Sequence, residues 1–205
     1  MSNIIRILAL ALLLAGVLMI NSCIKNNGED KQSSAEIKDD DDDDNIQVSN
    51  ADVFPILNSE SAIGNNAADF VWVDNGKEIK FSEYTKGKYV LLNFWGTWCP
   101  PCRKEVPDLI SIAKEMESKG LVVIGVAMER GHSIDKALRK VSKFWKNHNL
   151  TYPVVIGIQD IIDNYGGIEA VPTTFLINNK GEIVESIQGA KSKEEYMAEI
   201  QKMMK

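Results

Sequence analysis

Two hydrophobic periodicities alternate along the chain from about residue 63 onward. Runs of about four to eight apolar or alternating residues predict strands, and longer stretches with an apolar residue every three or four positions predict helices. The predicted strands cover residues 69–73, 78–81, 89–94, 121–128, 152–158, 173–177 and 182–188. The predicted helices cover about residues 101–119, 133–148, 160–165 and 192–205. Strands that alternate with helices, followed by a closing hairpin and a helix, predict an α/β fold with a mixed central sheet flanked by helices.

A separate apolar run, residues 7–20, follows Arg6 near the N-terminus. It has the length of a signal peptide and is short for a membrane span. The run ends in Ile20-Asn21-Ser22-Cys23, which resembles a bacterial lipobox, so Cys23 is the predicted site of lipidation. The alternatives are an uncleaved helical anchor and a signal cleaved elsewhere. All three possibilities place the protein outside the cytoplasm. Lipidation at Cys23 or an uncleaved anchor would also tether it to a bacterial membrane, on the periplasmic or outer face.

Charge divides the remaining chain into two parts. The net charge is -6, but residues 24–62 carry eleven acids against three bases, whereas residues 63–205 carry eighteen acids against nineteen bases. The run Asp39–Asp44 is typical of a solvated spacer, because a calcium site needs ligands folded around the ion. We predict that residues 1–23 are the export segment, 24–62 an acidic disordered linker and 63–205 the folded domain. The more apolar residues 51–61 leave open whether the end of the linker docks against the domain.

Two cysteines at a predicted helix start carry the candidate chemistry. Cys99 and Cys102 are separated by Pro100 and Pro101, directly after the strand 89–94. Unpaired N–H groups at a helix N-terminus favour a thiolate, so we expect Cys99 to attack a target disulfide and Cys102 to resolve the mixed disulfide. The two prolines remove backbone donors, which favours a reducing rather than a strongly oxidising pair.

Other uses of two cysteines are less consistent with the sequence. A metal clip needs about four ligands, and neither His132 nor His148 has an obvious spacing to the pair, so no metal is expected. Covalent haem attachment needs a histidine after the second cysteine, and Arg103 stands there. A permanent structural disulfide would close too small a loop to stabilise the fold much. The disulfide itself is therefore the expected redox group, with no separate cofactor.

The motif Trp95-Gly96-Thr97-Trp98-Cys99-Pro100-Pro101-Cys102, followed by Glu105 and Pro107, resembles the membrane-tethered thioredoxin-like oxidoreductases of the TlpA/ResA type, which are related to the AhpC/TSA–redoxin group. The resemblance covers about residues 63–205. It implies a thioredoxin-like fold with an N-terminal β-hairpin and a central helix–strand insertion.

A second matching segment is Ala170-Val171-Pro172-Thr173-Thr174. The resemblance implies that Val171-Pro172 is a cis bond facing the dithiol, the alternative being an ordinary trans proline. The residues that the resemblance and the position of Trp98 suggest for substrate binding are Trp98, Pro100, Pro101, Val171, Pro172 and Thr173.

The proton acceptor for Cys102 is not where ordinary thioredoxin has it. Thioredoxin has a buried aspartate six residues before its first cysteine, and this chain has Asn93, which cannot take a proton. Some members of the resembling type carry a glutamate after the next strand, and Glu129 matches that position. We therefore predict Glu129 as the acid/base group for Cys102, the alternative being a solvated loop acid.

These observations predict an extracytoplasmic thiol–disulfide oxidoreductase that reduces exported proteins, with apocytochrome c thiols as possible targets and a membrane thiol donor as the source of electrons. A peroxiredoxin-like peroxidase and a tethered binding module with an incidental dithiol are the alternatives. A peroxidase would need a Thr and Pro pocket before a single cysteine, and residues 94–98 lack it. The near-neutral domain lacks the clustered basic face of a nucleic-acid-binding protein. A monomer is expected.

Overall fold

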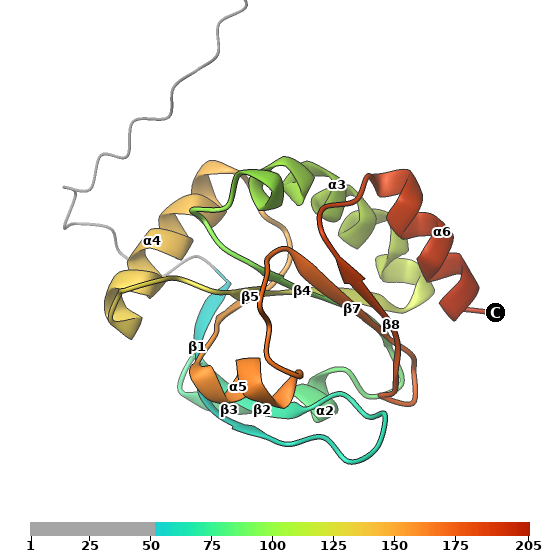
Figure 1. The fold of residues 1–205 in the computed structure, drawn as a ribbon, viewed down its shortest axis with the longest axis horizontal. Coiled ribbons are helices and arrows are strands. Elements are labelled where there is room, and N and C mark those ends of the chain that lie inside the picture. Colours follow the sequence, from blue (N-terminus) through green and yellow to red (C-terminus); the bar gives the residue numbers. More distant parts are fainter. Residues whose placement is uncertain (1–51) are drawn as a thin grey trace, which may run out of the picture. The chain divides into compact units, whose positions relative to one another are not determined.

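A computed structural model describes residues 52–205 (Figure 1). Within this range the strands form one mixed sheet in the order β3-β2-β1-β6-β5-β4-β7-β8. The strands are β1 Val53–Glu60, β2 Asp69–Asp74, β3 Lys77–Lys80, β4 Tyr89–Trp95, β5 Leu121–Ala127, β6 Val154–Ile156, β7 Thr173–Ile177 and β8 Ile183–Gln188. The helices are α2 Phe81–Tyr84, α3 Pro100–Met116, α4 Ile134–Asn147, α5 Gln159–Asn164 and α6 Lys193–Met203, with a 3₁₀ turn at Glu117–Lys119. The predicted α/β fold and its mixed sheet are confirmed.

Helices cover the sheet on both faces. Figure 1 shows α3, α4 and α6 on one face, and α2 and α5 on the other. Successive residues of β4 serve the two faces in turn: Leu91 packs with the α3, α4 and α6 layer, whereas Leu92 and Phe94 pack with the layer that contains α2 and α5. This period of two is the geometry of a strand, and burial on both sides explains why β4 reads as one continuous apolar run.

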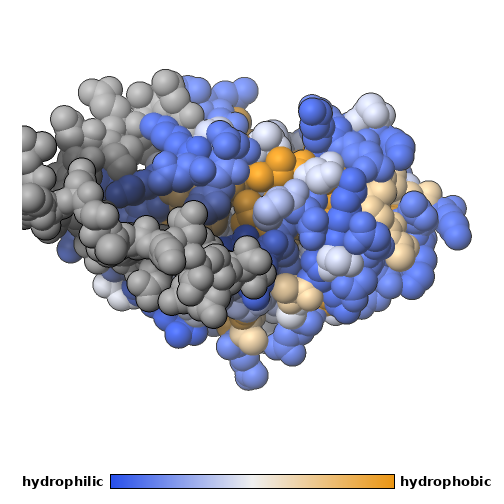
Figure 2. Space-filling model, turned by 90° about the horizontal axis from the view of Figure 1, so that it is seen from above, coloured by the Kyte–Doolittle hydropathy of each residue, from blue (hydrophilic) through white to orange (hydrophobic). Residues whose placement is uncertain are grey.

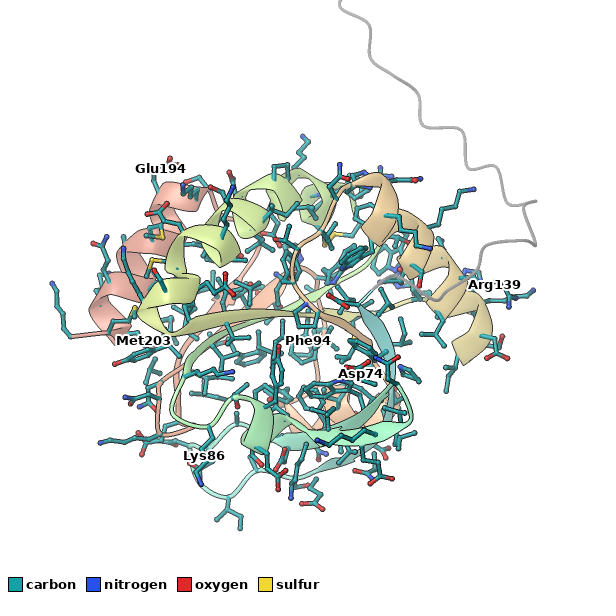
Figure 3. The ribbon with its side chains drawn as sticks, turned by 180° about the vertical axis from the view of Figure 1, so that it is seen from behind. Asp74, Lys86, Phe94, Arg139, Glu194 and Met203 are labelled. Atoms are coloured by element: carbon teal, nitrogen blue, oxygen red, sulfur yellow. A yellow bond between two sulfur atoms is a disulfide. The ribbon has the colours of Figure 1, made fainter. Side chains whose placement is uncertain are left out.

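The molecular surface contrasts with these two cores. Seen from the side of α3, α4 and α6, the visible surface is mostly hydrophilic (Figure 2). Figure 3 shows Phe94 in the interior, whereas Arg139 points away from the domain on α4. None of the helices within residues 52–205 combines the length and the apolar character that crossing a membrane requires.

The predicted N-terminal hairpin is confirmed as β2 and β3. Its turn places Asn75 at φ 49° and Gly76 at φ 75°, the left-handed conformations that two-residue hairpin loops require. A capping box fixes the start of α6, because the Ser192 side chain accepts from the Glu195 N–H and the Glu195 side chain accepts from the Ser192 N–H.

The linker boundary at residue 62 is wrong, because residues 53–60 form β1. This strand pairs antiparallel with β2 and parallel with β6, and it buries Val53 and Ile56 at 4% and 3% exposure. The reason is that β2 and β6 would otherwise present unpaired edges, and an apolar strand satisfies both. The predictions for residues 1–51, including Cys23, lie outside the described residues.

Candidate active site

The two cysteines lie where β4 ends and α3 begins. β4 ends at Trp95, and the chain turns so that the Cys99 N–H donates to the Gly96 carbonyl at 3.1 Å. Cys99 is the N-cap of α3, and its Sγ accepts from the Cys102 N–H at 3.3 Å. Pro100 and Pro101 occupy the first two helical positions, where a missing N–H costs no intrahelical hydrogen bond. The sequence thus places the first sulfur at the positive end of the helix dipole.

Cys99 and Cys102 form a disulfide with a Cα–Cα distance of 5.3 Å. Their exposures, 3% and 1%, differ too little to show which sulfur would attack a target disulfide. Their positions in the helix do show it. Sγ of Cys99 faces the N–H of Cys102 at the open end of α3, whereas Cys102 lies inside the first turn. Once reduced, Cys99 would be the better-stabilised thiolate, which agrees with its predicted role as the attacking residue.

The proline segment lies against this pair. The Val171–Pro172 bond is cis, as the resemblance implied, and Sγ of Cys99 lies 3.6 Å from the Val171 carbonyl oxygen. Thr173 begins β7 beside Phe94, and its hydroxyl donates to the Ala170 carbonyl at 2.8 Å. That hydrogen bond ties Thr173 to its own loop, so its side chain shapes the segment beside the sulfurs.

Trp98 is fixed from three sides. Its Nε1 donates to the Met128 carbonyl at 2.8 Å, and the Arg130 guanidinium lies 3.8 Å from the ring centroid. A Cβ at Gly96 would approach the indole Nε1 at 2.5 Å, so only glycine permits this ring position. Trp98 and Val171 line one groove of about 330 Å³, together with Glu129, Arg130 and Ile168. Two of the predicted substrate-binding residues thus share a concave surface beside the disulfide.

Glu129 is buried rather than solvated, which excludes the alternative of a solvated loop acid. Its side chain is 1% exposed, and its Oε1 accepts from the Thr97 N–H at 2.8 Å. Its Oε2 lies 3.5 Å from the Lys140 Nζ, without a hydrogen bond to any described residue. The carboxylate therefore binds the backbone of Thr97, which stands two residues before Cys99 in the chain, and faces a cation from α4. Its role as the acid/base group for Cys102 stays a prediction.

A second buried carboxyl group, Glu105, was not among the predicted catalytic residues. It lies on α3 three positions after Cys102 and is 2% exposed. Residues three apart on a helix share one face, so Glu105 and Cys102 are neighbours. Asn93 Nδ2 donates to Glu105 Oε1 at 2.9 Å, and Tyr196 Oη donates to Glu105 Oε2 at 3.1 Å.

The surroundings of Glu105 are neutral, and this changes its acidity. Burial raises the pKa of Glu105 to about 7, against the opposing effect of the hydrogen bonds from Asn93 and Tyr196. A carboxyl group that titrates near neutral pH can both accept and return a proton there. The sequence held one signal for it: Glu105 falls on the same apolar face of α3 as Val106 and Leu109, which are buried.

A dithiol at a helix start, held beside a cis-proline loop at the end of a central strand, defines a thioredoxin-like protein. The model of the AhpC/TSA family matches residues 63–186, which is more than half of the chain. The Thiol-disulfide oxidoreductase ResA of Geobacillus thermodenitrificans (strain NG80-2) is 37% identical over 135 residues, covering 65% of this chain and 74% of the relative.

Solved structures agree with this match. A thiol:disulfide interchange protein of the thioredoxin family from Chlorobium tepidum TLS has a TM-score of 0.60 and 30% identity, covering 71% of this chain and 99% of that one. The exposed lipoprotein thioredoxin Etrx1 from Streptococcus pneumoniae strain TIGR4 has a TM-score of 0.55 and 30% identity, covering 66% and 99%. The chain belongs to the AhpC/TSA family, and within it to the thioredoxin-like thiol–disulfide oxidoreductases similar to ResA.

Proposed function

We propose that this oxidoreductase works outside the cytoplasm, tethered to a bacterial membrane, and reduces disulfides in exported proteins, with the cysteines of apocytochrome c as candidate targets. The observation that carries the proposal is the Cys99–Cys102 disulfide at the start of α3, with Sγ of Cys99 beside the Val171 carbonyl and the groove lined by Trp98. The apolar run 7–20 and the lipobox-like end at Cys23 support the location and the tether. A relative whose name includes the words exposed lipoprotein is consistent with both.

The reaction begins with the reduced pair. The Cys99 thiolate attacks one sulfur of the target disulfide, forming a bond between the two proteins and releasing the other target sulfur as a thiolate. Cys102 then gives its proton to a nearby base and attacks Sγ of Cys99. This step breaks the mixed disulfide, forms the Cys99–Cys102 bond and releases the second target thiolate. Two electrons pass from the pair to the target, and a membrane thiol donor restores the pair.

Substrate binding in this proposal uses the groove and the proline segment. A target strand that runs along Val171 would bring its sulfur to Cys99, because the Val171 carbonyl lies 3.6 Å from that Sγ. The part of the Trp98 ring that Arg130 leaves uncovered would contact apolar target residues, since its Nε1 is already engaged by Met128.

Proton transfer from Cys102 has two candidate acceptors. Glu105 is a neighbour of Cys102 on α3 and has a pKa of about 7, so near neutral pH about half of it is available as a base. Glu129 is held by the Thr97 N–H and Lys140 on the groove side. We assign the proton of Cys102 primarily to Glu105, with Glu129 retained as the second candidate.

The test is to trap the mixed disulfide in cells. The Cys102→Ser variant of the full chain should accumulate covalent complexes with exported cysteine-containing proteins through Cys99, because the resolving thiol is absent. The Cys99→Ser variant is the matched control and should trap nothing. Capture of exported proteins that dithiothreitol releases supports the proposal, and the captured partners identify the targets. Equal capture by both variants, or none by either, would reject it.

A further inference from the structure

The C-terminal helix contributes to the surroundings of Glu105 through one residue, Tyr196. The capping box at Ser192 and Glu195 fixes the start of α6, and Tyr196 follows in its first turn. The Tyr196 side chain is 0% exposed, and its hydroxyl lies 3.1 Å from Glu105 Oε2 and 3.0 Å from Thr174 Oγ1. Lys193 of α6 also pairs with Glu115 of α3 at 2.9 Å, which holds the two helices together. The phenol is therefore held against the carboxyl group.

Four side chains form a closed ring of hydrogen bonds: Asn93, Glu105, Tyr196 and Thr174. Both hydrogens of the Asn93 amide are used, one on Glu105 Oε1 and one on Thr174 Oγ1, each at 2.9 Å. When Glu105 is charged, Tyr196 donates its only hydroxyl hydrogen to Glu105 Oε2. Thr174 can then donate to Tyr196, so within the ring each oxygen of the carboxylate accepts one hydrogen bond and each hydroxyl hydrogen has an acceptor.

The same ring also accommodates a protonated Glu105. The Asn93 nitrogen only donates, whereas the Tyr196 oxygen can accept as well. A proton on Glu105 Oε2 would therefore point at Tyr196, whose own hydrogen would turn to Thr174. Either hydroxyl of the Tyr196–Thr174 pair can be the donor, which is the freedom that this reversal needs.

We propose that Tyr196 is a positioning residue, whose hydroxyl works with that of Thr174 to hold the Glu105 carboxyl group in place in both its charged and its protonated form. The inference rests on the proposed role of Glu105 in proton transfer from Cys102. It assigns to the C-terminal helix α6 a part in the reaction at the start of α3.

Groups from every packed element act on the pKa of Glu105. Replacing Tyr196 by phenylalanine removes one of these effects without adding or removing a charge. Burial and, to a lesser extent, Asp108 of α3 raise the pKa of Glu105, whereas Asn93 of β4, Tyr196 of α6 and the Lys191 backbone lower it. Thr174 of β7 and Tyr152, just before β6, complete the surroundings. Tyr196→Phe removes one hydrogen bond to the charged form and should raise the pKa of Glu105 above its present value of about 7.

The experiment follows the reaction of the reduced full chain, in a neutral detergent, with 5,5′-dithiobis(2-nitrobenzoate). Attack by Cys99 releases one thionitrobenzoate and leaves the other on Cys99. Attack by Cys102 releases the second, so the slower phase in stopped flow reports the step that Glu105 assists. In Tyr196→Phe the pH midpoint of this phase should move up by about one unit. At pH 7 the phase should slow about fivefold, and above about pH 9 it should match the wild type.

The matched control is Tyr165→Phe. Tyr165 is also buried, and its hydroxyl donates to the Ala68 carbonyl at 2.9 Å on the other face of the sheet. This variant loses a comparable hydrogen bond but should keep the wild-type pH midpoint. Thr174→Val should shift the midpoint in the same direction as Tyr196→Phe, and Tyr196→Phe should have no further effect on the midpoint in a Glu105→Gln background.

The outcomes separate this inference from the proposed function. If the wild type shows no second phase at all, the dithiol reaction itself is wrong. If the wild type shows both phases but Tyr196→Phe and Tyr165→Phe have the same pH midpoint, Tyr196 only packs, and the inference is overturned. An upward shift in Tyr196→Phe alone supports it.

Discussion

Glu105 and Glu129 are both almost completely buried near the same dithiol, yet their partners differ in charge. Glu129 accepts from one backbone N–H and faces the ammonium group of Lys140. The side chains that donate hydrogen bonds to Glu105 are the Asn93 amide and the Tyr196 hydroxyl, and neither carries a charge. A buried carboxylate beside a cation keeps its charge at a lower cost than one among neutral partners. The difference teaches that burial among neutral partners is what raises the pKa of Glu105 to about 7.

The largest expected effect of the raised pKa of Glu105 is on how the free energy of unfolding depends on pH. Its pKa is raised from 4.5 to about 7 in the folded protein, so between these values the folded state binds more protons than the unfolded state. The contribution of Glu105 to the free energy of unfolding should therefore be greatest below about pH 4.5. It should decline as the pH rises through about 7, by about 3 kcal/mol in total. Urea titrations of the oxidised protein at several pH values measure this decline.

Glu105→Gln is the variant that tests the assignment of this slope, because an amide of the same shape cannot titrate. The difference in unfolding free energy between wild type and variant should depend on pH over this window. Tyr165→Phe, which leaves Glu105 and its hydrogen-bond partners intact, should leave the slope in place. Parallel pH curves for wild type and Glu105→Gln would contradict the prediction.

The next effect is on the rate of the second reaction step. Glu105→Gln should slow the second release of thionitrobenzoate about 100-fold at pH 7, because general base catalysis contributes at least about that factor. The first release depends on Cys99 and should change by less than about threefold. An equal loss in both phases would point to distortion of the helix start rather than to a lost base.

Glu129→Gln should have a smaller effect on the same phase. We expect about tenfold slower resolution with little loss of stability, because the amide oxygen can still accept from the Thr97 N–H. Unchanged kinetics in this variant would remove Glu129 from the mechanism. A loss as large as that of Glu105→Gln would overturn the ranking of the two acids.

The smallest effect, a change in stability, is expected on substitution of Lys140. Lys140 is 39% exposed, so water screens its interaction with Glu129, and Lys140→Met should destabilise the protein by only about 1 kcal/mol at low salt. Lys136→Met, one turn earlier on the same side of the helix but exposed and, among the described residues, in no ion pair with Glu129, is the control and should change stability less. Thermal unfolding at low and high salt measures both, and a loss at Lys140 that salt does not reduce would argue for lost packing instead.

Much of the fold and of the dithiol site could be predicted because their signals are local. The hairpin turn at Asn75-Gly76, the apolar run of β4 and the two cysteines at a helix start each depend on a few neighbouring residues. The cis bond at Val171–Pro172 came from a resemblance in five consecutive residues. Each of these features is confirmed in the described residues.

The parts that were missed depend on partners far apart in the chain. β1 reads as the more apolar end of an acidic linker whose docking the sequence leaves open, and only the edges of β2 and β6 make it a strand. Glu105 reads as one more polar residue on a helix. Its neutral environment is assembled by Asn93, Thr174 and Tyr196, which no spacing in the sequence brings together. Long-range packing therefore determines both β1 and the surroundings of Glu105, which local sequence patterns do not predict.

The position of β1 also has a consequence for the order in which the protein is made. Val53 pairs with Val154, so β1 leaves the ribosome long before its parallel partner exists. The antiparallel edge can be filled early by β2, which follows shortly along the chain, but the other edge stays open until β6 has been synthesised. Contacts between distant segments form slowly, and an open apolar strand edge invites association with other chains. We therefore expect closure of β1 onto β6 to be a late folding event, during which the nascent chain benefits from a chaperone.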